Sequence, residues 1–177
     1  MVIIIVTLII CIVLFLWALY RDKLLFIKVK LENVEEKINS TLIKRRALVQ
    51  DSEKIIKNVL NTDKQIYENV SDLSNPNISM MELDRKLLVY INEFYLIKDK
   101  YKKLQNSDEF QTIAFEINET EDKLNAYKEY YNDTALKYNK LIKSFPQNII
   151  SFIKRIKEKE FFDKKSISDS DYKDFKY

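Results

Sequence analysis

The chain has 177 residues, a net charge of +3 from 30 Lys and Arg against 27 Asp and Glu, and neither Gly nor His. Without Gly it cannot form the glycine-rich loops that bind phosphates, and without His and with one Cys it lacks common zinc ligands and Cys/His catalytic pairs. Both signs of charge are interleaved, which is unlike a nucleic-acid-binding stripe. We expect no cofactor, no metal site, no catalytic residue and no nucleic-acid partner.

Residues 1–20 contain no charge and no Pro. A helix of this length is about 30 Å long, which matches a bilayer core, so the run predicts a transmembrane helix. A cleaved signal peptide and a buried core helix are the alternatives. Basic residues do not precede the run and bulky Leu19 and Tyr20 end it, which argues against cleavage. Cys11, in mid-span, is interpreted as an apolar packing residue.

The orientation of this span follows from its flanks. Trp17 and Tyr20 lie at one end, where aromatic rings favour the membrane interface, and the basic residues Arg21, Lys23, Lys28 and Lys30 follow. Because basic flanks stay in the cytoplasm, we predict a single-pass protein of the cell membrane, with its N-terminus outside and its C-terminal domain cytoplasmic. The charge bias is one-sided, so the reversed topology remains the alternative.

The next segment predicts one long amphipathic helix. From the membrane to Pro76 there is neither Gly nor Pro, and apolar residues recur at intervals of three and four; they are Leu31, Val34, Ile38, Leu48, Ile55, Val59 and Ile66. Polar Arg45 and Ser52 lie on the same seam, and Asn61-Thr62-Asp63 is a candidate break.

A second helix is expected from Met80. Residues 74–77 have turn chemistry, and Ser79 followed by Glu82 has the spacing of a capping box. Its seam has the spacing of a coiled coil and consists of Met80, Leu83, Leu87, Tyr90, Phe94, Ile97, Tyr101 and Leu104. We expect Asn106-Ser107-Asp108 to end it.

A third helix follows, and Pro146 ends it. Its seam consists of Phe110, Ile113, Ile117, Leu124, Tyr127, Tyr131, Tyr138, Leu141 and Phe145. Pro146 suits the first turn of a short fourth helix, whose expected apolar face is Ile149, Phe152, Ile153 and Ile156. The predicted fold is all-α: a transmembrane helix at 1–20, an elongated antiparallel bundle of about four helices at 21–162, and a polar, disordered tail at 163–177.

Four asparagines fall seven residues apart on the third helix; they are Asn118, Asn125, Asn132 and Asn139. Our hypothesis is that this column flanks the seam and hydrogen-bonds to a neighbouring helix, as polar seam residues set register in coiled coils. Chance alignment in an Asn-rich chain remains the alternative.

The C-terminal third resembles the LemA family of bacterial membrane-anchored helical proteins. The residues that carry this resemblance are Tyr131-Asn132, Tyr138-Asn139, Phe145-Pro146 and the aromatic pair Phe161-Phe162. Lys44-Arg45-Arg46 resembles the basic triplet on the family's first long helix, although Leu48-Val49-Gln50-Asp51 departs from the stretch that follows there. The resemblance implies an N-terminal span and a cytoplasmic helical bundle, and it supplies no activity.

The same residues have structural interpretations. Aromatic residues at helical spacing usually form part of the core. The structural interpretation of the basic triplet is a solvated helix face with an internal partner for Arg45, and the functional interpretation is a site for an acidic partner or an anionic ligand.

We expect a non-enzymatic scaffold or adaptor that binds the lipid bilayer and, through helical surfaces, other proteins, with homo-oligomerisation left open. An extracytoplasmic sensor of reversed topology is the alternative, and a carboxylate-dependent hydrolase is less favoured.

Overall fold

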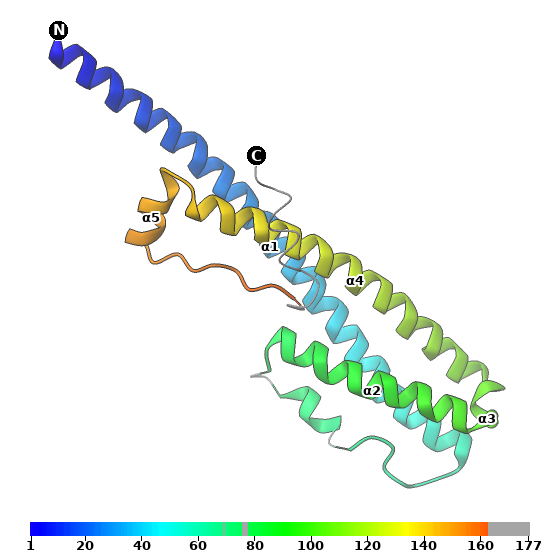
Figure 1. The fold of residues 1–177 in the computed structure, drawn as a ribbon. Coiled ribbons are helices and arrows are strands. Elements are labelled where there is room, and N and C mark those ends of the chain that lie inside the picture. The colour runs from blue at the N-terminus through cyan, green and yellow to red at the C-terminus, as the bar shows by residue number, and fades with distance from the viewer. Residues whose placement is uncertain (69, 76–77, 163–177) are drawn as a thin grey trace. The chain divides into compact units, whose positions relative to one another are not determined.

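The structure is a computed structural model that describes residues 1–68, 70–75 and 78–162. The tail expected at 163–177 and the turn residues Pro76 and Asn77 lie outside this range. Within it every secondary-structure element is a helix and there are no strands, as Figure 1 shows. The elements are α1 (Val2–Leu60), the 3-10 helix η1 (Val70–Ser74), α2 (Met80–Lys100), α3 (Lys102–Gln105), α4 (Asp108–Lys143) and α5 (Gln147–Ile153). The predicted all-α fold class is confirmed.

The helices divide into two compact units, which are described separately. Unit 1 contains residues 1–35 and the described residues from 129 onward, and unit 2 contains residues 36–128. Helices α1 and α4 each contribute to both units.

In unit 1, the first part of α1 is apolar and uncovered. It is long and apolar enough to cross a membrane, and no part of its apolar window is buried among the described residues. A core helix would be mostly buried, so this observation argues against the buried-core alternative; a membrane anchor or a signal sequence fits it. Burial starts with half-buried Tyr20 and Leu24 and is complete at Leu31, where α1 packs against the rest of the unit.

Helix α1 ends at Leu60, earlier than the predicted seam, which included Ile66. Asn61 follows with a φ of 51°, in the left-handed region that asparagine tolerates, and the Thr62 amide donates to the Lys57 carbonyl at 3.0 Å. This is a Schellman-type end. The candidate break at Asn61-Thr62-Asp63 is therefore where α1 stops, and Ile66 lies in the connection to α2.

In unit 2, α1 and α2 run in the same direction, and both run antiparallel to α4. Lys44 pairs with Glu116 and Lys37 lies over the Tyr127 ring, whereas on α2 Asp84 pairs with Lys128 and Tyr95 with Asn118. We expected each helix to run antiparallel to the one before it. The segment between α1 and α2 is long enough to bring the chain back, so the prediction is wrong for α1 and α2 and holds for α2 and α4 (Figure 1).

Helix α2 begins at Met80, as predicted, with Ser79 as N-cap: its Oγ accepts from the Glu82 amide at 3.2 Å. The predicted second helix is interrupted at Tyr101, whose backbone is extended, and continues as the short α3. Its seam residues Leu83, Leu87 and Phe94 are buried, and Phe94 stacks on Phe110 of α4 with ring centroids 4.6 Å apart. These rings form part of the core of unit 2.

The short helix α5 differs from the prediction in two ways. Pro146 is its N-cap rather than a residue of its first turn. The expected apolar face is largely exposed, at 52% for Ile149, 86% for Phe152 and 73% for Ile153, and Phe145 is 65% exposed, although we placed it in the core. The prediction assumed that an apolar face is covered by the same chain, and the inward side of α5 is polar instead.

Candidate functional site

Two asparagines of α4 hold an extended C-terminal segment in unit 1. The Asn139 side chain donates to the Lys159 carbonyl and accepts from the Lys159 amide, both at 2.8 Å. Asn132 does the same with Phe162, at 2.8 and 2.9 Å. Each side-chain amide thus pairs with one residue's backbone as a neighbouring strand would. We call these four residues the asparagine clasp.

The spacing of the clasp follows from helix and strand geometry. Seven residues of an α-helix rise about 10.5 Å, and three residues of extended chain span about 10 Å. Asn132 and Asn139 therefore match Phe162 and Lys159 in register. A heptad spacing on α4 suits an extended partner as well as it suits a helix.

Aromatic and charged side chains surround the clasp. The Tyr131 ring meets Phe162 edge to face at 5.1 Å, and Lys159 Nζ bonds Glu35 Oε1 of α1 at 2.8 Å. Burial, followed by the negative charge and hydrogen bond of Glu35, raises the pKa of Tyr131 to about 12. The phenol therefore stays protonated at neutral pH, where it is a packing and hydrogen-bonding group.

The resemblance residues of the C-terminal third differ in burial. Tyr131, Tyr138, Asn139, Pro146 and Phe162 are buried, whereas Phe161 is half-buried and Phe145 is exposed. The structure gathers Tyr131, Asn132, Asn139 and Phe162 at the clasp. Phe145 and Pro146 lie at the turn into α5.

The other two asparagines of the predicted column behave differently. Asn118 Oδ1 accepts from the Tyr95 hydroxyl of α2 at 2.6 Å, a contact with a neighbouring helix of the kind we expected. Asn125 bonds Glu121 of its own helix at 3.3 Å. Three of the four thus join α4 to another segment, although two of these partners are extended chain rather than helix.

The basic triplet of α1 pairs inside unit 2. Lys44 Nζ lies 3.0 Å from Glu116 Oε2, and Arg46 Nη1 donates to the Leu73 carbonyl at 3.2 Å. Arg45 is fully buried and its Nη2 pairs with Glu121 Oε2 of α4. These contacts supply an internal partner for each of the three charges.

Arg45 is the electrostatic centre of this region. Among the described residues no N–H of its guanidinium is aligned for a hydrogen bond. The ion pair with Glu121 is therefore the contact that offsets the free-energy cost of burying this charge. Nearby, burial raises the pKa of Tyr95, Arg45 opposes that shift and Glu121 adds to it. The ion pair between Arg45 and Glu121 thus joins α1 to α4 within unit 2.

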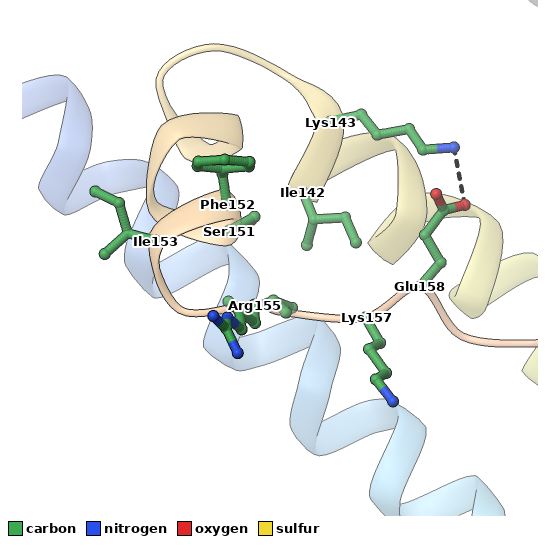
Figure 2. A pocket seen from close by; sticks show the side chains of 9 residues that line it. Ile142, Lys143, Ser151, Phe152, Ile153, Arg155, Lys157 and Glu158 are labelled. Carbon is green, nitrogen blue, oxygen red and sulfur yellow. Dashed lines mark ion pairs between the residues drawn. The ribbon is translucent and has the colours of Figure 1, made fainter.

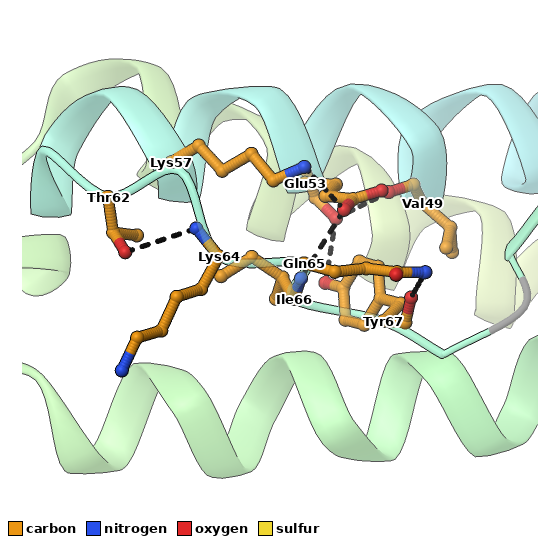
Figure 3. A network of polar contacts seen from close by, with 9 residues as sticks. Val49, Glu53, Lys57, Thr62, Lys64, Gln65, Ile66 and Tyr67 are labelled. Atoms are coloured by element: carbon orange, nitrogen blue, oxygen red, sulfur yellow. Dashed lines mark hydrogen bonds and ion pairs between the residues drawn. The ribbon is translucent and has the colours of Figure 1, made fainter.

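Two further polar clusters were not predicted. Asp84 and Lys128 form a nearly buried ion pair at 2.5 Å. Each lies directly after a seam residue of its helix, Leu83 or Tyr127, and this position is the signal in the sequence that points to them. Figure 3 shows the second cluster, which joins the last turns of α1 to the segment after it: Glu53 binds Lys57 at 2.9 Å and the Ile66 amide at 3.3 Å. Both clusters tie segments of unit 2 together.

Tyr67 is the buried anchor of the cluster in Figure 3. Its hydroxyl lies 2.9 Å from Ser52 Oγ of α1, and its ring meets Tyr90 of α2 edge to face at 5.7 Å. Burial raises the pKa of Tyr67. The connection between α1 and α2 is thereby fastened to both helices.

The described residues offer few places where a reaction could occur. They contain no group of three or more His, Cys, Asp or Glu that could hold a metal ion. One open pocket lies between α5 and the end of α4 (Figure 2), and another, lined by Glu68, Asp72 and Glu93, lies beside α2. Both are open to solvent, and in the first of them Lys143 pairs with Glu158 at 2.8 Å.

Comparison with known proteins gives one match. The family model described as LemA family matches residues 34–173. The matched range includes the basic triplet and the clasp. No curated protein and no solved structure was found to match the chain.

Proposed function

The chain belongs to the LemA family, and from this premise we propose that it is a non-enzymatic, membrane-anchored scaffold. Residues 1–20 are the anchor, with the N-terminus outside the cell membrane and the C-terminal domain in the cytoplasm. The domain presents helical surfaces to other proteins.

The observation that carries the anchor is the uncovered apolar run of α1. Residues 1–19 are exposed throughout, and apolar side chains such as Ile3 (78%) and Phe15 (65%) would face water in a soluble protein. The first charge, Arg21, comes at the point where burial begins. A bilayer is the environment that suits such a helix.

The non-enzymatic part of the proposal is supported by how the polar groups are used. The charged and amide side chains singled out above bind other parts of the same chain, and the pockets are open. Exposed apolar side chains occur on unit 2 as well, including Val89 (63%), Leu96 (70%) and Phe115 (70%). Such side chains suit contact with a partner helix.

Cysteine labelling in intact cells tests the topology. In a Cys11→Ser background, Leu96→Cys should resist a membrane-impermeant maleimide until the cells are permeabilised. Labelling of Leu96→Cys in intact cells would instead support the extracytoplasmic sensor, and recovery of a shortened chain in the soluble fraction would show that residues 1–20 are a cleaved signal.

Crosslinking in native membranes followed by mass spectrometry tests the scaffold. Photoreactive residues at Leu96 and Phe115 should give discrete protein adducts, whereas one at Asp122, an exposed polar position of α4, should give few. Equal, diffuse labelling at all three would contradict a specific contact surface.

A further inference from the structure

Helix α5 has its polar side turned inward and its apolar side turned outward. Gln147 and Ser151 are buried, and Gln147 Oε1 and Ser151 Oγ have no hydrogen-bond partner among the described residues. On the other side Ile149, Phe152 and Ile153 are between half and almost fully exposed. A helix on a water-facing surface has the opposite arrangement, with its apolar side buried and its polar side exposed. The exposed apolar side of α5 is therefore suited to an apolar partner rather than to water.

Basic residues follow this apolar surface. Between Phe145 and Lys157 the chain carries Lys154, Arg155 and Lys157 and no acidic residue. All three basic side chains are exposed. Figure 2 shows Phe152 and Ile153 on α5 and Arg155 and Lys157 on the segment directly after it. An apolar surface with an aromatic ring and a basic border is typical of helices that lie in the membrane interface.

The position of α5 within unit 1 favours the same partner. Figures 1 and 2 both place α5 beside the part of α1 that follows the apolar run, where burial of α1 begins at Tyr20. Because α5 lies beside α1 just after the apolar run, lipid headgroups around the end of the span would be within its reach.

We propose that α5 and its flanks, residues 145–157, form a second membrane contact that lies in the headgroup region beside the span and is strengthened by anionic lipid. This inference rests on the proposed anchor. Phe145, Ile149, Phe152 and Ile153 enter the interface, and Lys154, Arg155 and Lys157 pair with lipid phosphates. The contact fixes unit 1 against the membrane surface, which a single span would leave free to rotate.

Fluorescence quenching of the full-length chain in phosphatidylglycerol-containing vesicles tests the proposal. An environment-sensitive dye is attached at Phe152→Cys in a Cys11→Ser background. Quenching by lipids spin-labelled near the headgroup should be strong and quenching by aqueous iodide weak. The matched control is Tyr130→Cys, another exposed aromatic of unit 1, about 20 Å from Lys143 along α4, where iodide should quench and lipid should not.

Charge and anchor are tested separately. In these vesicles, replacing Lys154 and Arg155 with Gln should lower the ratio of lipid-bound to free α5 about fivefold per charge removed. In phosphatidylcholine vesicles the same replacements should have little effect. A dye on native Cys11 reports the span itself and should be quenched by lipids labelled deep in the acyl chain.

The outcomes distinguish the two proposals. If Cys11 lies in lipid but the dye at 152 is freely quenched by iodide, the α5 contact is wrong and the anchor stands. If Cys11 is open to iodide, the anchor fails first. Protection of position 152 from iodide without lipid quenching would mean that protein, such as a second copy of the chain, covers α5, and would overturn the membrane contact.

Discussion

At the scale of single residues, this protein uses polar side chains to join its own segments. Asn132 and Asn139 each satisfy both backbone groups of one residue in an extended segment that has no strand beside it within the described residues. A buried backbone group without a partner is costly, so the two amides replace a missing strand. The tyrosine–asparagine pattern therefore marks a structural contact.

We predict that Asn139→Ala destabilises unit 1 by about 1–3 kcal/mol, because the Lys159 amide and carbonyl lose their partners. Asn132→Ala should do the same at Phe162. Thermal unfolding measures the change, and protease cleavage after Lys157 or Lys159 should accelerate. Asn125→Ala is the control, since its amide is exposed and bonds only Glu121; an equal loss in this variant would contradict the clasp.

A second residue-scale prediction concerns Arg45. Removing its partner with Glu121→Ala leaves a buried, uncompensated charge and should cost about 3 kcal/mol or more in denaturant unfolding. Glu116→Ala, which frees half-exposed Lys44, should cost less than about 1 kcal/mol. The double variant Arg45→Met/Glu121→Ala should recover part of the loss. If it is as unstable as Glu121→Ala alone, the charge is not the cause.

At the scale of elements, helix ends decide the path of the chain more than helix interiors do. The end of α1 at Leu60 and the N-cap Ser79 define a connection that crosses unit 2 and makes α1 and α2 parallel. Tyr67 fastens this connection from its middle. The apolar period continues to Ile66, so periodicity alone extends α1 too far.

Asn61 is the residue to change at this scale. With a φ of 51°, Asn61→Val should destabilise unit 2 by about 1–2 kcal/mol, because a β-branched side chain is strained in the left-handed region. Asn61→Gly should be neutral or slightly stabilising. Thermal melts of the two variants check the difference, and equal stability would mean that the helix end tolerates another geometry.

At the scale of the whole molecule, the two units share α1 and α4 yet differ in their surroundings. Unit 1 carries the uncovered apolar run and α5, and unit 2 carries the aromatic core around Phe94 and Phe110. None of residues 1–19 is buried by the described residues. The first nineteen residues therefore add nothing to the packing of the described residues.

Deleting residues 2–19 should accordingly leave the melting temperature within a few degrees of the full-length value, since no buried contact is lost. The truncated protein should leave the membrane pellet under high salt, whereas the full chain needs detergent. Circular dichroism melts and fractionation measure the two effects. A large drop in melting temperature would show that the apolar run packs against protein.

Much of the fold could be predicted because it depends on local pattern. The uncharged length of residues 1–20, the three–four spacing of Leu83 and Leu87, and the Ser79 cap each act within a few residues of their position. These features determined the apolar helix, the all-α class and the start of α2. The resemblance carried by Tyr131-Asn132 and Tyr138-Asn139 likewise indicated the family that the chain matches.

Only the tertiary structure decided which partner each polar group has and which apolar faces are covered. Nothing near Asn139 in sequence indicates that Lys159 lies opposite it, and the same holds for Arg45 and Glu121, which are far apart in the chain. Helix α5 has an apolar face by pattern, but whether that face meets protein depends on what folds beside it. Hydrogen bonds, ion pairs and burial require groups to meet in space, and sequence spacing alone does not specify those meetings.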